Sequence, residues 1–239
     1  MSSIVFGGVD FAPLCSAQVV ARSLNGYAVD SVRVAGRPGA VPTGAWMPPE
    51  DVRVRLFLEP GFEPGAGGMA DARHRLRSWL ARPGGATLSL PDEPGLHYRD
   101  AYLVEAGAWT SLLSDGECDV TFTLFDPIAY GALRTERTTS FEVRGTWPAL
   151  PTLALAAKAG GEVRVAHAQS GRAIAIAGPF AGGEELVVDC ERGRVGVDGA
   201  DATARVSLSS DFFALTCGPC ELALSGCVLS GVTYWERWL

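Results

Sequence analysis

Short runs in which apolar and polar residues alternate recur along most of this chain. Such a period of two places every second side chain on the same face, which is typical of β-strands with one buried face. The 29 glycines and 15 prolines supply turn residues between these runs, so a mostly β chain is predicted. The runs cover residues 52–58, 119–124, 163–165, 172–177, 221–225 and 232–239.

One segment has a different period. Between residues 69 and 82 the apolar side chains are Met69, Ala72, Leu76, Trp79 and Leu80, which is the spacing of one helix face. Two glycines precede the segment and a Pro-Gly-Gly sequence follows it. The sequence therefore predicts a single helix over 69–82 within an otherwise β chain.

A domain boundary is expected near residues 145–151, where two prolines and a glycine separate strand patterns. The predicted domains are 1–145, which holds the helix and a long Gly/Pro loop at 36–49, and 146–239. The second contains only short strands at close spacing, which indicates a small β-sandwich.

The charge balance and the hydropathy pattern exclude several classes of protein. The formal net charge is −7, which argues against nucleic acid as a main partner, because phosphates require a basic face. No apolar run is long enough for a transmembrane helix, and the first residues lack the pattern of a signal peptide. Synthesis and folding in the cytoplasm are therefore expected.

The motif Cys217-Gly218-Pro219-Cys220 has the spacing of a thioredoxin redox site. That chemistry needs the first thiol at a helix N-terminus, whereas the residues that follow alternate as in a strand, so a turn is favoured. A zinc site that also uses Cys190 and Cys227 is the next alternative, but a second Cys-x-x-Cys pair is missing. Buried thiols or an opportunistic disulfide are predicted instead, with no metal and no cofactor.

The sequence assigns no catalytic residue. His74, His97 and His167 lack the i, i+4 spacing of a helical metal pair. A Ser-His-Asp triad assembles in space and stays open, although no G-x-S-x-G motif supports it. The glycine-rich segment 61–68 lacks the Lys-Ser/Thr pair of a phosphate loop. A protein without enzymatic activity is therefore predicted.

The chain has six tryptophans, and exposed indole rings can stack on sugars. A carbohydrate-binding module is accordingly the alternative function. Trp79 lies on the apolar face of the predicted helix and is expected in the core. Trp46 lies in the Gly/Pro loop 36–49, where burial within the domain is hard to arrange, and is predicted to anchor a protein contact.

Several segments together resemble the distal tail proteins (Dit) of long-tailed, non-contractile bacteriophages. The strand and turn Val120-Thr121-Phe122-Thr123-Leu124-Phe125-Asp126-Pro127-Ile128-Ala129-Tyr130-Gly131 is the most specific of them, and the order and spacing fit over nearly the whole chain. The Cys217–Cys220 turn falls where the family usually has a Pro-Gly turn. The other matching segments are 72–80, 88–95, 97–103, 187–189, 193–199 and 231–239.

This resemblance implies an all-β fold with one helix, made of an N-terminal β-sandwich with an extended arm or hairpin and a C-terminal galectin-like β-sandwich. Six copies would form a ring through the N-terminal domain and join the tail tube to the tip and the receptor-binding apparatus. The protein would be located at the tail tip of the virion after assembly in the host cytoplasm. No catalysis and no lectin activity are implied.

A ring of this kind has interfaces between neighbouring copies, and three residues are the candidates for them. Trp46, with the loop that contains it, is the candidate for the arm that reaches a neighbour. Arg53 and Arg55 lie on the outer face of the following strand and could pair with acidic residues across the interface. That the two arginines are simply exposed to solvent, without a partner across an interface, is an equally weighted alternative.

Overall fold

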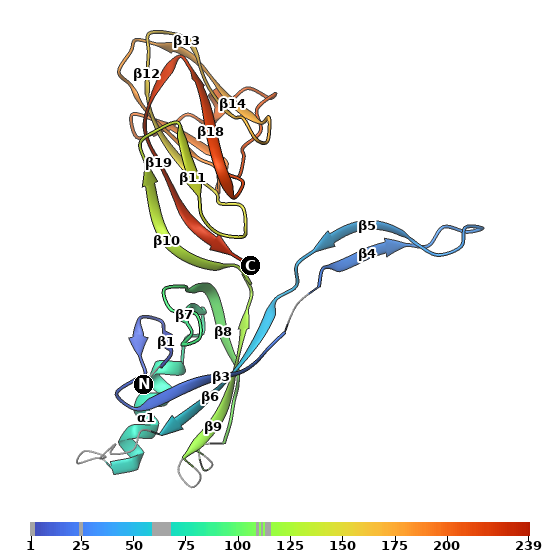
Figure 1. The fold of residues 1–239 in the computed structure, drawn as a ribbon, viewed down its shortest axis with the longest axis vertical. Helices are drawn as coiled ribbons and strands as arrows, with labels where there is room; N and C mark the ends of the chain where they lie inside the picture. The colour runs from blue at the N-terminus through green and yellow to red at the C-terminus, as the bar shows by residue number, and fades with distance from the viewer. Residues whose placement is uncertain (1–2, 24–25, 59–67, 109, 111, 113–115) are drawn as a thin grey trace. The chain divides into compact units, whose positions relative to one another are not determined.

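The computed structural model describes residues 3–23, 26–58, 68–108, 110, 112 and 116–239. The chain divides into two compact units, Met1–Ala129 and Tyr130–Leu239. Both units are built from β-strands, and the first also contains the helix (Figure 1).

The first unit contains an antiparallel sheet of seven strands in the order β2-β1-β7-β8-β9-β6-β3 and a separate hairpin of β4 and β5. Alternation determines which faces are buried: Val52, Val54 and Leu56 of β6 are fully buried, as predicted, while the side chains between them are more exposed. The bounds are β1 (Val5–Phe6), β2 (Val9–Asp10), β3 (Cys15–Arg22), β4 (Ala28–Val32), β5 (Val41–Trp46), β6 (Glu50–Leu58), β7 (Ala86–Ser89), β8 (Tyr98–Ala106) and β9 (Glu117–Leu124).

The seven-stranded sheet curls over on itself. Strands β7 and β8 lie between β1 and β9 in the hydrogen-bonded order, so a flat sheet would separate β1 from β9 by about 14 Å. Instead, the rings of Phe6 in β1 and Phe122 in β9 have centroids 5.0 Å apart. Two layers thus face each other across the core, as expected of a sandwich.

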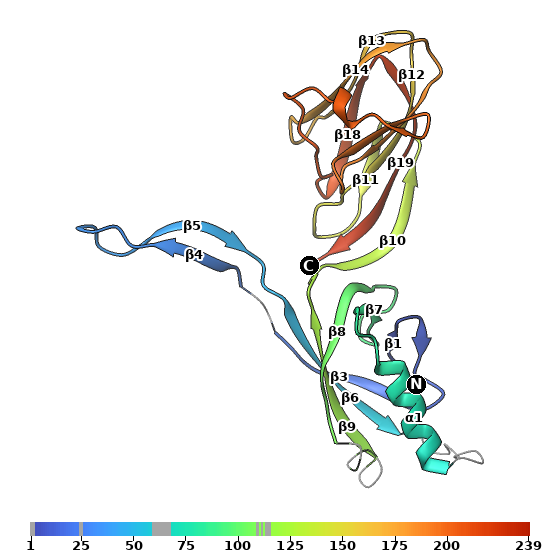
Figure 2. The same cartoon turned by 180° about the vertical axis from the view of Figure 1, so that it is seen from behind.

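Helix α1 (Gly68–Leu80) packs against this sheet (Figure 2). Ala72, Leu76 and Leu80 are buried, and the Trp79 ring lies 5.2 Å from the ring of Phe11. The helix agrees with the predicted span 69–82 apart from its last residues, since it ends before Pro83, which cannot continue it.

The second unit is a sandwich of two antiparallel sheets. The six-stranded sheet has the order β10-β19-β12-β15-β16-β17, and the four-stranded sheet has the order β11-β18-β13-β14. The bounds are β10 (Ala129–Glu136), β11 (Ser140–Val143), β12 (Thr152–Ala157), β13 (Gly160–His167), β14 (Ala173–Phe180), β15 (Glu185–Asp189), β16 (Arg194–Val197), β17 (Ala200–Asp201), β18 (Gly218–Ser225) and β19 (Cys227–Trp238).

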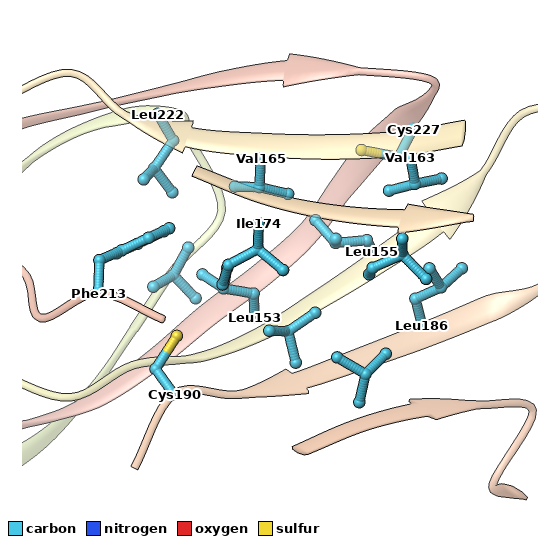
Figure 3. Packing of buried hydrophobic residues seen from close by; sticks show 14 of the residues in the cluster. Leu153, Leu155, Val163, Val165, Ile174, Leu186, Cys190, Phe213, Leu222 and Cys227 are labelled. Carbon is cyan, nitrogen blue, oxygen red and sulfur yellow. The ribbon is translucent and has the colours of Figure 1, made fainter. Parts of the chain in front are cut away.

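Side chains from the inner faces of both sheets form one core in this unit. Leu153 and Leu155 of β12 meet Val163 and Val165 of β13, and all four are fully buried (Figure 3). The alternation that predicted β13 and β14 is confirmed here, since Ile174 also points into this core. The predicted class, an all-β chain with one helix and β-sandwich domains, is confirmed.

The compact units do not divide the chain at residue 145, where the sequence analysis expects the boundary. Strand β10 pairs with β19, and β11 pairs with β18 through Phe141 and Cys220. Residues 130–145 therefore belong to the second unit. The prolines near residue 148 mark a turn inside that unit rather than a linker.

No helix in the described ranges has the length and apolar character needed to span a membrane.

Candidate interaction surfaces

Exposed apolar side chains concentrate on the β4–β5 hairpin and its flanks. None of the residues of β4 or β5 is buried, so the hairpin contributes nothing to the core. A concentration of exposed apolar side chains is typical of a protein contact site. The large exposed apolar side chains of this segment are Val20, Tyr27, Val29, Val32, Val34 and Trp46.

The structure places Trp46 at the end of β5, opposite Ala28 of β4, with half of its surface exposed. Among the tryptophans that the structure describes, it is the only exposed one. Trp79 is partly buried against Phe11, as expected of a core residue. Trp109 lies outside the described residues. The segment predicted as a loop at 36–49 is in part a strand, because Val41–Trp46 pairs with β4.

Arg53 and Arg55 lie together on the outer face of β6, but their partner is in the same chain. Arg55 faces Asp119 directly across the β6–β9 ladder and contacts both of its carboxylate oxygens, at 2.7 and 3.2 Å. Arg53 Nη2 lies 2.7 Å from the same carboxylate. The hydrogen bond from Arg55 lowers the pKa of Asp119. Trp46 is not part of this cluster.

The free backbone edges of the first unit include β2 at one end of the sheet and two stretches that flank the strands β3, β6, β9 and β8. Strand β3 is an end strand of the sheet and, among the described strands, pairs only with β6. Strand β8 pairs with β9 on one side, and on its other side it pairs with β7 only as far as Ala101. Residues 103–106 of β8 therefore have no strand on the β7 side in the described part of the chain. Val104 in this stretch is exposed. These two edges lie on opposite sides of the four strands β3, β6, β9 and β8.

A partly buried ionic network, which no local sequence pattern indicates, lies where the hairpin leaves the sheet. Arg22, the last residue of β3, donates to the Tyr98 hydroxyl at 2.8 Å and to Asp92 at 3.0 Å. The Tyr98 hydroxyl in turn donates to Glu93 at 2.8 Å. Burial raises the pKa of Tyr98, and the hydrogen bond to Glu93 raises it further. Arg22 and Tyr98 are 76 residues apart in the sequence. Their contact depends on how the strands are ordered in the sheet and cannot be predicted from the local sequence.

Neither a redox site nor a zinc site at the cysteines is supported by the described residues. Cys217 and Cys220 lie at the start of strand β18 and not at a helix N-terminus. Burial raises the pKa of both thiols, that of Cys220 to about 11, whereas a redox thiol needs a lowered pKa. No group of three or more histidine, cysteine or acidic side chains that could hold a metal occurs in the ranges described.

In comparisons with known proteins, the second unit is similar to a known family in sequence, and the whole chain is similar to a solved structure in fold. Residues 144–238 match the family model of the siphovirus-type tail component, C-terminal domain (SPP1_Dit). No curated protein sequence matches the chain. The crystal structure of the Dit protein of phage SPP1, described as a paradigm of the hub adsorption apparatus in phages that infect Gram-positive bacteria, is similar over 100% of both chains, with 18% identity and a TM-score of 0.75.

Two structures of the phage p2 baseplate in its activated conformation, with strontium and with calcium, are also similar. Each covers 92% of this chain and 90% of the other, with 9% identity and a TM-score of 0.44. The resemblance to Dit proteins that the sequence indicates is confirmed by the SPP1_Dit family match in the C-terminal domain and by the fold of SPP1 Dit.

Proposed function

We propose that this chain is a structural protein of a siphovirus-type phage tail, in which six copies form a ring that joins the tail tube to the tip and the receptor-binding apparatus. The observation that carries the proposal is the match of residues 144–238 to a tail-component domain. The fold shared with SPP1 Dit over the full length supports it. On this proposal the protein has no enzymatic activity or cofactor, and it resides at the tail tip of the virion after assembly in the host cytoplasm.

The free edges of β3 and β8 support a ring. The outer edge of β3 and residues 103–106 of β8 lie on opposite sides of the same sheet. If the β8 edge of one copy pairs with the β3 edge of the next, the contact is head-to-tail, and such contacts form a ring when the rotation between copies closes. The same pairing satisfies backbone groups that otherwise form an exposed edge.

The β4–β5 hairpin supports contacts beyond the sheet. Its apolar side chains have no core to join, and Val29 and Trp46 are each at least half exposed. In the proposed ring, this hairpin is the arm that covers a neighbouring copy. Arg53 and Arg55 are proposed to take part in the ring interface as a preformed cluster with Asp119, since Arg53 stays more than half exposed.

The ring is tested by light scattering during size-exclusion chromatography together with negative-stain imaging. We expect annular particles with about six times the chain mass of 25.1 kDa. A strictly monomeric protein at high concentration, with no annular particles alone or on tail tubes, overturns the proposal.

An edge variant adds a sharper test. Val104→Lys places a charge on the free edge of β8, which opposes strand pairing, and should abolish rings without changing the melting temperature. Val228→Lys is the matched control, because Val228 has nearly the same exposure, 53% against 56%, but lies in β19 of the second unit. Rings that persist in Val104→Lys exclude this edge as the contact.

A further inference from the structure

A hollow of about 280 Å³ lies between helix α1 and the sheet of the first unit. Its floor is apolar and comes from Leu76 and Leu80 of the helix and Val120 of β9. Arg73 and Arg77 also line it, and they are exposed one helical turn apart on the same face of α1. The ligand that fits such a site is an apolar side chain flanked by carboxylates.

The hollow is large enough for an aromatic ring, since an apolar cavity of about 150 Å³ already holds benzene. The other described members of its lining are small or apolar: Ala106, Gly107 and Cys118. The two arginines therefore provide the charged recognition at this site.

The chain itself presents a side chain of the required kind. Phe125, directly after β9, is 56% exposed, and its ring packs edge-on against Tyr102 at 5.2 Å. Its backbone N–H donates to the carbonyl of Asp100, whose residue is exposed, and Asp126 is its neighbour in sequence. An aromatic ring held in place beside two acidic residues complements an apolar hollow with an arginine rim.

Phe125 cannot reach the hollow of its own chain. Cys118 lines the hollow at one end of β9, and Phe125 follows the other end. Seven residues of extended strand separate the two by about 24 Å. A contact between the two surfaces therefore joins two molecules.

We propose that the hollow between α1 and β9 receives Phe125 of a second copy of this chain, with Arg73 and Arg77 facing the acidic residues beside that ring. The contact is head-to-tail along the direction of β9. It is separate from the pairing of strand edges and adds a second kind of contact between copies. It rests on the proposed function only in that the chain associates with itself.

Photo-crosslinking tests the contact directly. A benzophenone amino acid replaces Phe125, which keeps an aromatic side chain there, and protein labelled with ¹⁵N is mixed with unlabelled protein before irradiation. Mass spectrometry of mixed-isotope peptides then reports only contacts between molecules. We expect position 125 of one copy to be joined to α1 or to residues 106–120 of another.

Charge reversal is the second arm. Arg73→Glu with Arg77→Glu should reduce the yield of this cross-link by about tenfold or more, and Asp100→Arg in the same chain should restore part of it. Arg75→Glu is the matched control, because Arg75 lies on the same helix but pairs with Asp71 at 2.9 Å and does not line the hollow. All of these side chains except Asp71 are exposed, so folding should be unaffected.

The outcomes separate this inference from the ring. Rings without a cross-link between position 125 and the hollow overturn the inference and leave the proposed function intact. The expected cross-link in particles that are annular neither alone nor on tail tubes supports the inference and overturns the ring. Cross-links of equal yield after the arginine reversal also overturn the inference.

Discussion

His167 is a buried titratable residue in the core of the second unit. It is fully buried, its ring stacks on Phe213 with centroids 5.4 Å apart, and its Nδ1 lies 2.9 Å from the Ser170 hydroxyl. Its Nε2 has no hydrogen-bond partner within the described part of the chain. Burial lowers the pKa of His167, because a protonated ring at this position would be a charge in an apolar core.

The lowered pKa predicts a loss of stability in acid. The unfolded chain takes up the histidine proton below about pH 6.5 and the folded chain does not, so the free energy of unfolding falls as the pH drops. One proton accounts for at most about 1.4 kcal/mol per pH unit. Urea unfolding of wild-type and His167→Gln protein at pH 7 and pH 5 should show a smaller loss in the variant.

His74→Gln is the control, because His74 is exposed on the helix. It should leave the pH dependence as in the wild type. An equal loss of stability in wild-type and His167→Gln protein would show that His167 does not contribute to the acid sensitivity.

At the residue scale, the sequence could predict which side chains are buried but not which charged ones meet. Alternation placed Val52, Val54 and Leu56 inside the sheet and Arg53 and Arg55 outside. Whether those arginines pair within the chain depends on the register of β6 against β9, which puts Arg55 opposite Asp119. The hydrophobic pattern fixes which face of a strand is buried. Strands β6 and β9 are not joined by a short turn, so the pattern alone does not say which residue of β9 lies opposite Arg55.

At the element scale, the β4–β5 hairpin is the part of the first unit that the sequence described least well. Its glycines and prolines predicted an extended loop, yet residues 41–46 pair with β4 despite Pro42. A proline is tolerated because both strands of a two-stranded hairpin are edge strands. The curl of the large sheet was also hidden in the sequence, since it follows from strand order and not from alternation.

Removing the hairpin should leave the domain stable and prevent assembly. No residue of β4 or β5 is buried, so replacing residues 27–46 by a short Gly-Ser turn should change the free energy of unfolding by no more than about 0.5 kcal/mol. Denaturant unfolding measures the stability, and light scattering measures the assembly. Full-sized rings from the shortened chain would show that the hairpin is not the arm.

At the scale of the whole molecule, the two units have separate cores, and the position of their boundary has a consequence for folding. Strands β10 and β11 close the edges of the two sheets in the second unit. Val143 of β11 is buried in that core, Phe141 stacks on Tyr234 at 6.0 Å, and the Tyr234 hydroxyl donates to the Glu142 carbonyl at 3.3 Å. A domain that begins at residue 146 lacks all of these contacts.

Two fragments test where the second domain begins. The fragment 130–239 contains every strand of both sheets except the first residue of β10, so it should be monomeric and unfold cooperatively. The fragment 146–239 loses two strands and exposes the buried ring of Tyr234, which should lower the free energy of unfolding by about 3 kcal/mol or more and cause aggregation. Thermal unfolding followed by circular dichroism compares the two. Equal stability of the two fragments would place the folding boundary at residue 145. Strands β10 and β11 would then be accessory to the sandwich, because their apolar contacts would contribute nothing measurable to the stability of its core.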